Sequence, residues 1–436
     1  MTIAESILTT GQQPVADILS LAEAPRRSLR ICLLGYRSDP FGGGQGVYIR
    51  YLSKALLEAG HSVDVISGEP YPHVVDGVRL IKMPGLNLYA NGLFSLRPRH
   101  LGSMANIVEW FSKLTGGFAE PYSFGLRVVK YLRQHGQQYD LIHDNQSLCS
   151  GLLQLQEMGL SVVTTVHHPI TSDLQIALNA SHRWWERLLI RRWHSFLRMQ
   201  TRVVRRLKHV ITVSDCSRTD IAKAFAIDRD AIALIYNGID TEVFKPCPEV
   251  PRAERRLIAT ASADQPLKGL HFLLKAFVIL RKEFPDLQLL VIGKPKPGGK
   301  TEKLVRRLHL GEELRFERGI TTQELVERYA ASTLAVVPSI YEGFGLPAGE
   351  AMACGVPVVS TDGGALPEVV GDAGVIVPTA DAEGLATAIA ALLNNPTQRA
   401  ELAQRGRERI LAKFSWRVVA HTLTDYYEQV LAHADR

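Results

Sequence analysis

The fold is encoded most clearly in one stretch of the chain, SIYEGFGLPAGEAM at residues 339–352. It follows an apolar run at 334–337 that is typical of a buried strand. Pro347 is suited to the first turn of a helix, and Gly355 is suited to the position just after its end. The stretch therefore predicts a strand, a glycine-rich turn and a helix, which is the repeating unit of a parallel α/β sheet.

The same alternation extends in both directions from this stretch. Strands are expected at 31–35, 62–66, 140–143, 162–167, 210–213, 231–235, 257–260, 287–292, 334–337, 356–360 and 375–377. Helices are expected at 45–59, 124–134, 148–157, 184–208, 217–225, 270–283, 301–309, 322–331 and 382–393. Because the strands are continuously apolar, the pattern predicts an α/β fold with doubly wound parallel sheets covered on both faces.

The chain has 436 residues, which is more than one hydrophobic core usually serves. An Asn237-Gly238 turn and a proline-rich stretch at 245–251 interrupt the alternation and predict a linker. We expect two doubly wound α/β domains. The expected boundaries are a tail at 1–28, a first domain at 29–245, a second domain at 246–413 and a C-terminal helix at 414–436.

Composition excludes several classes of protein. Hydrophobic residues make up 46% of the chain and charged residues 22%, which is typical of a globular protein and not of a disordered or collagen-like chain. The five cysteines are odd in number and include no close pair, which favours a reducing, cytoplasmic compartment and no zinc site. No apolar run approaches the ~20 residues needed to span a bilayer.

The turn at 342–350 has the chemistry of an anion site. Backbone N–H groups at a helix start lack helical partners, so those of four consecutive residues are expected to point at a phosphate: Gly343, Phe344, Gly345 and Leu346. Glu342 precedes the turn, where its carboxylate could reach a sugar ring. Glu350 lies within the helix, where it could accept hydrogen bonds from ribose hydroxyls. An ordinary helix with acidic residues near its start would account for Glu350 alone.

Two other loops follow strands. Gly42, Gly43 and Gly44 precede Gln45 after the first strand and would let the backbone approach a ligand closely, although a flexible turn is an equal alternative. The Gly-x-Gly-x-x-Gly spacing of a dinucleotide site fails here, which disfavours a dehydrogenase. In the loop at 262–269, Lys268 supplies a point charge suited to a diphosphate.

Together these motifs resemble the retaining nucleotide-sugar glycosyltransferases of family 4, whose GT-B fold has two Rossmann-like domains facing a central cleft. The resemblance extends from about Arg30 to the C-terminal helix. It implies that 29–245 is an acceptor-binding Rossmann-like domain, that 246–413 is a nucleotide-sugar-binding Rossmann-like domain, and that the helix at 414–436 returns to the first of them. Its motifs are the donor motif EGFGLP with Glu350, the glycine loop GGGQ at 42–45, the hinge YNGIDTEVFKP at 236–246, and the segments 355–360 and 363–369. The matches occur in the family's order along the chain.

The resemblance implies roles for individual residues. It makes Lys268 the diphosphate-binding lysine and His167 the histidine that contacts the donor hexose, so that His167, Lys268 and Glu342 are the candidate catalytic residues. Ser262 stands where the family usually has an arginine, and Arg318 is a candidate to compensate. His168 occupies a position that is often acidic in the family. Further candidates are Gly43, Gly44 and Ser262 for donor phosphates, and Gln45 and His168 for the acceptor.

The implied activity is transfer of a hexose from a UDP- or GDP-linked donor to a hydroxyl of a membrane lipid or glycan intermediate, with retention at the anomeric carbon. No cofactor and no metal ion are expected, because Lys268 and helix dipoles would supply the charge; Asp228-Arg229-Asp230 is interpreted as a solvated turn. The alternatives are a GT-B nucleotide-sugar epimerase or hydrolase and, with less support, a protein that binds nucleic acid or a membrane surface.

The basic charge of the chain is localised. The formal net charge of the chain is +6. Residues 183–208 hold nine basic residues and one glutamate, so this segment alone carries +8 and the rest of the chain carries −2. Helical spacing places apolar residues on one face of this segment and arginines on the other. Trp184, Arg187 and Arg191 could contact an anionic membrane, such as the inner face of the plasma membrane, whereas a core-packed helix with a solvated basic face is an equal alternative. No nucleic-acid partner is expected.

Overall fold

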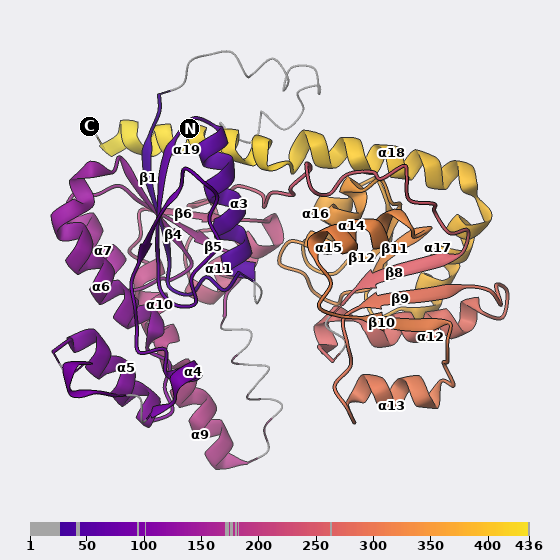
Figure 1. Cartoon of the computed structure of the whole chain (residues 1–436), viewed down its shortest axis with the longest axis horizontal. Coiled ribbons are helices and arrows are strands. Elements are labelled where there is room, and N and C mark those ends of the chain that lie inside the picture. Colours follow the sequence, from indigo (N-terminus) through magenta and orange to yellow (C-terminus); the bar gives the residue numbers. More distant parts are fainter. Residues whose placement is uncertain are drawn as a thin grey trace. The chain divides into compact units, whose positions relative to one another are not determined.

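The computed structural model describes residues 27–40, 44–93, 96–100, 102–170, 174, 178, 181, 183–261 and 264–434. These residues form two compact units, each of which is described by itself (Figure 1). The first unit contains the described residues up to Val213, those from Ser217 to Ile235, and those from Ala420 onward. The second contains Ser214–Cys216 and Tyr236–Val419.

The first unit is built on a seven-stranded parallel sheet in the order β3-β2-β1-β4-β5-β6-β7. Its strands are β1 (Arg30–Gly35), β2 (Ser62–Ser67), β3 (Arg79–Lys82), β4 (Leu141–Asn145), β5 (Val162–Val166), β6 (His209–Thr212) and β7 (Ile232–Leu234). Its helices are α3 (Gly44–Glu58), α4 (Leu88–Asn91), α5 (Met104–Leu114), α6 (Glu120–His135), α7 (Gly151–Glu157), α9 (Trp184–Trp193), α10 (Leu197–Val204) and most of α11 (Asp215–Phe225).

The second unit has a six-stranded parallel sheet in the order β10-β9-β8-β11-β12-β13. Its strands are β8 (Arg256–Thr260), β9 (Gln288–Ile292), β10 (Leu314–Glu317), β11 (Leu334–Val337), β12 (Val358–Thr361) and β13 (Val375–Val377). Its helices are α12 (Leu270–Leu280), α13 (Lys300–Arg307), α14 (Thr322–Ala330), α15 (Leu346–Ala353), α16 (Leu366–Val370), α17 (Ala382–Asn394) and α18 (Pro396–Lys413).

The last helix, α19 (Trp416–Ala434), begins in the second unit and belongs to the first from Ala420 onward. Buried polar contacts attach its second part to the first sheet. His61 Nε2 lies 2.8 Å from Thr424 Oγ1, and His143 Nδ1 lies 2.5 Å from the Tyr427 hydroxyl. The predicted fold, including the return of the C-terminal helix, is confirmed.

Several predicted elements differ from those observed. The helix expected at 184–208 is wrong: α9 ends at Trp193, a 3-10 segment covers His194–Phe196, and α10 follows. The edge strands β3 and β10 and helix α5 were not predicted; the two strands are short, and in neither is the sequence continuously apolar. None of the helices in the described ranges is long and apolar enough to cross a membrane.

Candidate functional site

In each unit, candidate residues lie at the point where the strand order reverses. In the second sheet the innermost strands β8 and β11 pair side by side although they are not consecutive in the chain. Ligands of open α/β sheets bind at such a point, beyond the carboxyl ends of the strands. The loop after β8 carries Lys268 and the loop after β11 carries Glu342, so the topology brings these two predicted residues together.

Lys268 and Glu342 form an ion pair. Lys268 Nζ lies 2.7 Å from Glu342 Oε1, with the two side chains 28% and 10% exposed. Ser339 Oγ donates to the same carboxylate oxygen at 2.8 Å. The two loops are also joined through the backbone, because the Ile340 N–H donates to the Leu267 carbonyl at 2.8 Å. The Lys268 ammonium is therefore held at a defined place that remains partly open to solvent.

Two glycines make this junction possible. Gly269 has a φ of 65°, and a Cβ there would lie 1.8 Å from the Pro338 carbonyl oxygen. Gly345 has a φ of 102° and caps α15 without a side-chain hydrogen bond. Other residues are strained in this left-handed region. The start of α15 is thereby left uncapped by any side chain, as an anion-binding helix N-terminus requires.

Glu350 lies one turn into α15. Burial raises the pKa of its carboxyl to about 7, and a hydrogen bond from Tyr329 partly offsets this rise. The Tyr329 hydroxyl also lies 2.8 Å from Thr260 Oγ1, at the end of β8. Glu350 is thus attached to the end of the same strand that leads to the Lys268 loop. The residue as a whole is partly exposed.

In the first unit the strand order reverses at β1, which pairs with both β2 and β4. His167 directly follows β5, which pairs with β4 on the side away from β1. Its ring packs edge-on against Tyr48, with the ring centres 4.6 Å apart. Its backbone N–H donates to Gln146 Oε1 at 2.7 Å, and Gln146 Nε2 donates to the His168 carbonyl at 2.7 Å. Gln146 therefore fixes the backbone of both predicted histidines.

The tautomer of His167 follows from its contacts. Asn145 Nδ2 donates to the Gln45 carbonyl at 3.2 Å, which leaves Asn145 Oδ1 as the acceptor facing His167 Nε2 at 2.7 Å. Nε2 must then hold the proton, and Nδ1 is a hydrogen-bond acceptor. Burial, with smaller contributions from His168 and His143, lowers the pKa of His167 to about 3. The ring is therefore neutral near pH 7.

Asn145, Gln146 and Ser339 were missed by sequence reasoning, although each lies at the carboxyl end of a strand. A run of polar residues at 144–147 straight after a buried strand is the signal that could have indicated the first two. His143, by contrast, is buried between Tyr427 and Thr165, so it is a core residue of the first unit rather than a ligand contact.

Other predicted residues lie elsewhere. Trp184 and Arg191 are exposed on α9, and Arg187 donates to the Leu178 carbonyl at 2.8 Å. Gly44 and Gln45 begin α3. Arg318 is exposed just after β10, two strands from β8. Gly43 and Ser262 lie outside the described residues.

The Asp228-Arg229-Asp230 segment lies between α11 and β7 as a local turn. The Asp228 carboxylate accepts from the Asp230 N–H at 3.0 Å, and the Asp230 carboxylate pairs with Arg218 at 3.4 Å. Within the described ranges, no three His, Cys, Asp or Glu side chains gather into a possible metal site.

Comparison with known proteins identifies the class. Residues 42–243 match the family model described as Glycosyltransferase Family 4, and residues 248–409 match that of Glycosyl transferases group 1. The chain is 42% identical over 410 residues to MMP alpha-(1->4)-mannosyltransferase of Mycolicibacterium hassiacum, with 93% of this chain and 99% of that protein covered. This chain therefore belongs to glycosyltransferase family 4 and is a glycosyltransferase with the GT-B fold.

More distant relatives agree with this class. The phosphatidyl-myo-inositol mannosyltransferase of Mycolicibacterium smegmatis is 28% identical, over 91% of this chain and 92% of its own length. Among solved structures, sucrose-phosphate synthase of Thermosynechococcus elongatus has a TM-score of 0.68 at 26% identity, covering 93% of this chain and all of that one. HepE of Anabaena, in complex with UDP and glucose, has a TM-score of 0.67 at 18% identity, covering 92% of this chain and 100% of that one, a likeness of fold alone.

Proposed function

We propose that this protein is a retaining α-mannosyltransferase that transfers mannose from a UDP- or GDP-linked donor to a hydroxyl of a glycan acceptor. The observation that carries the proposal is the junction of Lys268 and Glu342 at the strand reversal of the second unit, beside the uncapped start of α15. The 42% identical relative named as an α-(1→4)-mannosyltransferase supports the choice of mannose and of an α-(1→4) linkage.

The second unit supplies the groups that the departing nucleoside diphosphate needs. When the bond between the anomeric carbon and the diphosphate oxygen breaks, negative charge develops on the phosphate. The Lys268 ammonium and the N–H groups at the start of α15 (from Gly343 to Leu346) would stabilise it, and preorganised groups of this kind are usually the largest contribution to catalysis. Glu350 would accept hydrogen bonds from the ribose hydroxyls, and Glu342 from the sugar hydroxyls.

The first unit would bind the acceptor. In this proposal the acceptor oxygen attacks the anomeric carbon on the face that the diphosphate leaves, and its proton passes to the departing phosphate oxygen. This balances the reaction without an enzyme nucleophile, a metal ion or a cofactor. His167, with Nε2–H held by Asn145, would offer Nδ1 as an acceptor to a hexose hydroxyl, while Gln45 and His168 would lie on the acceptor side.

The test compares Lys268→Ala, Lys268→Arg and Glu342→Ala with the unaltered protein, using GDP-mannose and UDP-mannose as donors and a mannoside acceptor. Removing one charge-stabilising group typically costs about a hundredfold or more in rate, so we expect such a loss in kcat/KM for Lys268→Ala. Glu342→Ala should lose a similar factor, because the Lys268 ammonium and the sugar hydroxyls are then no longer held in place. The arginine variant keeps the charge and should retain more activity than Lys268→Ala.

Lys275→Ala is the matched control, because Lys275 is exposed on α12 beyond the loop. Near-normal transfer by either alanine variant at the candidate site would contradict the site assignment. Release of free mannose from the donor at the same rate with and without acceptor would favour the hydrolase alternative.

A further inference from the structure

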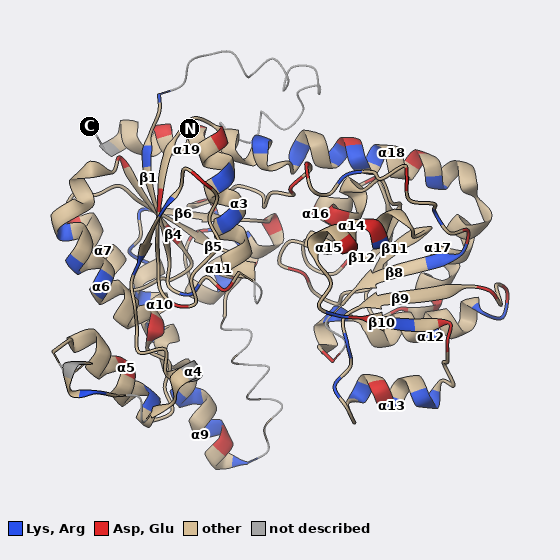
Figure 2. Cartoon of the chain, viewed as in Figure 1, with Lys and Arg blue, Asp and Glu red and all other residues tan. Residues whose placement is uncertain are grey.

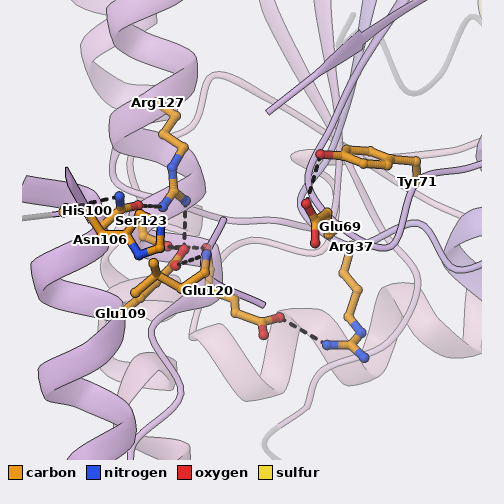
Figure 3. A network of polar contacts seen from close by, with 10 residues as sticks. Arg37, Glu69, Tyr71, His100, Asn106, Glu109, Glu120, Ser123 and Arg127 are labelled. Carbon is orange, nitrogen blue, oxygen red and sulfur yellow. Dashed lines mark hydrogen bonds and ion pairs between the residues drawn. The ribbon is translucent and has the colours of Figure 1, made fainter. Parts of the chain in front are cut away.

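Helix α5 has an inverted arrangement of polar and apolar faces. Its polar side chains are directed into the protein: Glu109 accepts from Arg127 Nη1 at 2.6 Å and from the Leu86 N–H at 2.9 Å, and Ser123 donates to the same carboxylate (Figure 3). Asn106 Oδ1 accepts from Arg127 Nη2 at 2.7 Å. These buried contacts to α6 and to the chain before α4 hold α5 in one orientation.

The opposite face of α5 is apolar and exposed. Met104, Ile107, Phe111 and Leu114 follow one another at three- and four-residue spacing, and they are 68%, 38%, 60% and 52% exposed. A helix on a globular protein normally turns such a face toward the core. Here Glu109 and Arg127 occupy that side as an ion pair whose side chains are only 8% and 14% exposed. The apolar face therefore has no partner within the described part of the chain that buries it.

Helix α9 extends this face. None of its residues is buried, and Trp184, Trp185, Leu188 and Leu189 are 76%, 43%, 59% and 50% exposed. Of the two alternatives for this segment, a membrane-contacting helix and a core-packed helix with a solvated basic face, the core-packed one does not hold for α9, because Trp185 and Leu189 are exposed.

Contacts join the C-terminal ends of the two helices. Arg192 Nη2 donates to Thr115 Oγ1 at 2.6 Å, just after α5, and Lys113 Nζ lies 5.7 Å from the centre of the Trp193 ring. We call the eight exposed residues the apolar surface: Met104, Ile107, Phe111, Leu114, Trp184, Trp185, Leu188 and Leu189. They are eight of the twelve large apolar side chains exposed in the described ranges, so the clustering far exceeds the scattered exposure that is normal.

The charge around the apolar surface is basic. Helix α9 and the residue before it carry Arg183, Arg187, Arg191 and Arg192 against the single Glu186 (Figure 2). Two of these arginines are held by hydrogen bonds to neighbouring segments, and Arg183 and Arg191 are exposed. A groove of about 400 Å3 beside α5, lined by Phe111, Tyr122, Met199 and other mostly apolar residues, adds further apolar area, with Arg192 also in its lining.

The charge decides between two occupants of this surface. A second copy of the chain related by twofold symmetry would place the same arginines opposite one another, because both copies present the same patch. An anionic lipid bilayer instead offers phosphates to the arginines and an apolar interior to Phe111, Leu188 and the tryptophans, which favour the interface between the two. We propose that the apolar surface binds the protein to anionic membranes, with α5 and α9 inserted at the lipid headgroup level.

The test measures co-sedimentation with vesicles of phosphatidylcholine containing about 30 mol% phosphatidylglycerol, and with vesicles of phosphatidylcholine alone. We expect binding to the anionic vesicles at low salt that is at least about tenfold tighter than to the neutral ones, since each nearby arginine adds attraction. Tryptophan fluorescence should shift to shorter wavelength on binding, because Trp184 and Trp185 leave water.

Three double variants separate insertion from nonspecific adsorption. Phe111→Glu with Leu188→Glu should lose at least about tenfold in vesicle affinity. Ile279→Glu with Leu411→Glu replaces two exposed apolar residues of the second unit and should bind as the unaltered protein does. Arg183→Gln with Arg191→Gln should reduce the preference for anionic vesicles. Denaturant unfolding followed by tryptophan fluorescence without lipid, which reports mainly on the first unit, together with a thermal shift by a nucleoside diphosphate, which reports on the second unit, confirms that each variant is folded.

The proposal is overturned if the unaltered protein does not bind anionic vesicles at low salt, or if Phe111→Glu with Leu188→Glu binds them equally well. It is also overturned if sedimentation velocity without lipid shows a dimer that these substitutions dissociate, because the surface would then belong to a second copy. None of these readouts depends on transferase activity, so failure here leaves the proposed function intact and failure of that function leaves this proposal intact.

Discussion

Lys268 and Glu342 neutralise each other in the absence of a donor, and a diphosphate changes this balance. The ion pair is partly exposed, so its own contribution to folding stability is small. The ion pair instead positions the Lys268 ammonium. Glu342, which itself accepts from Ser339, holds the ammonium where phosphate oxygens would lie. We expect the incoming diphosphate to take over most of the Lys268 interaction, which frees the Glu342 carboxylate to accept from sugar hydroxyls.

The raised pKa of Glu350 predicts a pH dependence of donor binding. Only the ionised carboxyl accepts two hydrogen bonds from ribose hydroxyls, and with a pKa of about 7 its ionised fraction rises about tenfold from pH 6 to pH 8. The donor KM should fall by up to that factor over this range. Glu350→Gln should remove the dependence and raise KM at pH 8.

Glu312→Gln is the control for this measurement, since Glu312 is exposed and remote from α15 in the chain. A donor KM that is unchanged from pH 6 to pH 8 in the unaltered protein would exclude the ribose role of Glu350.

Individual site residues could be predicted from the sequence where the motif that indicates them lies within one loop. The glutamates and glycines at 342–350 and Lys268 could be placed because each has a local signal in its own loop. The contacts among Asn145, Gln45 and His167 could not, because the partners are 100 and 22 positions apart and meet only through strand pairing.

At the scale of elements, Gly269 determines how the loops after β8 and β11 pack. Alanine there would place Cβ 1.8 Å from the Pro338 carbonyl oxygen, so the two loops must separate. We predict that Gly269→Ala weakens donor binding at least about tenfold, because the Lys268 ammonium moves with its loop. The measurement is a titration with the nucleoside diphosphate.

Gly298→Ala is the matched control for the strain itself. Gly298 has a φ of 70°, close to that of Gly269, but no atom lies within 4 Å of an added Cβ. This substitution should cost only the strain of a left-handed alanine, about 1 kcal/mol of stability, and leave donor binding unchanged. Equal effects of the two substitutions would show that close approach of the loops is not required.

The elements that sequence reasoning missed have a common physical cause. The alternation of strands and helices was predictable because both sheets are parallel and buried on both faces. Helix α5 was not, since its polar face is buried by Glu109 and Arg127 and its apolar face is exposed. The apolar residues at 184–208 have continuous helical spacing, but a 3-10 turn interrupts the helix there. The aromatic contacts of Phe118 with Trp193 and Phe196 lie at this turn, and the spacing of apolar residues does not reveal them.

At the scale of the whole molecule, buried histidines predict loss of stability in acid. Burial lowers the pKa of both His143 and His167 to about 3, so the unfolded chain binds protons near pH 6.5 that the folded chain does not. Their contribution to stability is present above pH 6.5 and is lost as the pH falls toward 3. Each histidine should reduce the free energy of unfolding by about 1.4 kcal/mol per pH unit in that range.

Denaturant unfolding followed by tryptophan fluorescence measures this effect, because four of the five tryptophans belong to the first unit. His143→Gln should make the acid dependence shallower by one proton. His135→Gln, at an exposed position on α6, should not change it. An identical pH slope for His143→Gln and the unaltered protein would mean that His143 titrates normally in the fold.

The proposed transfer of mannose with retention is tested by analysing the product of the reaction. The purified protein is incubated with GDP-mannose or UDP-mannose and a mannoside acceptor, and the new glycosidic bond is examined by nuclear magnetic resonance. We expect an α-linked mannose on the acceptor and one nucleoside diphosphate released per bond formed. A β-linked product, or donor consumption with no mannose added to the acceptor, would contradict it.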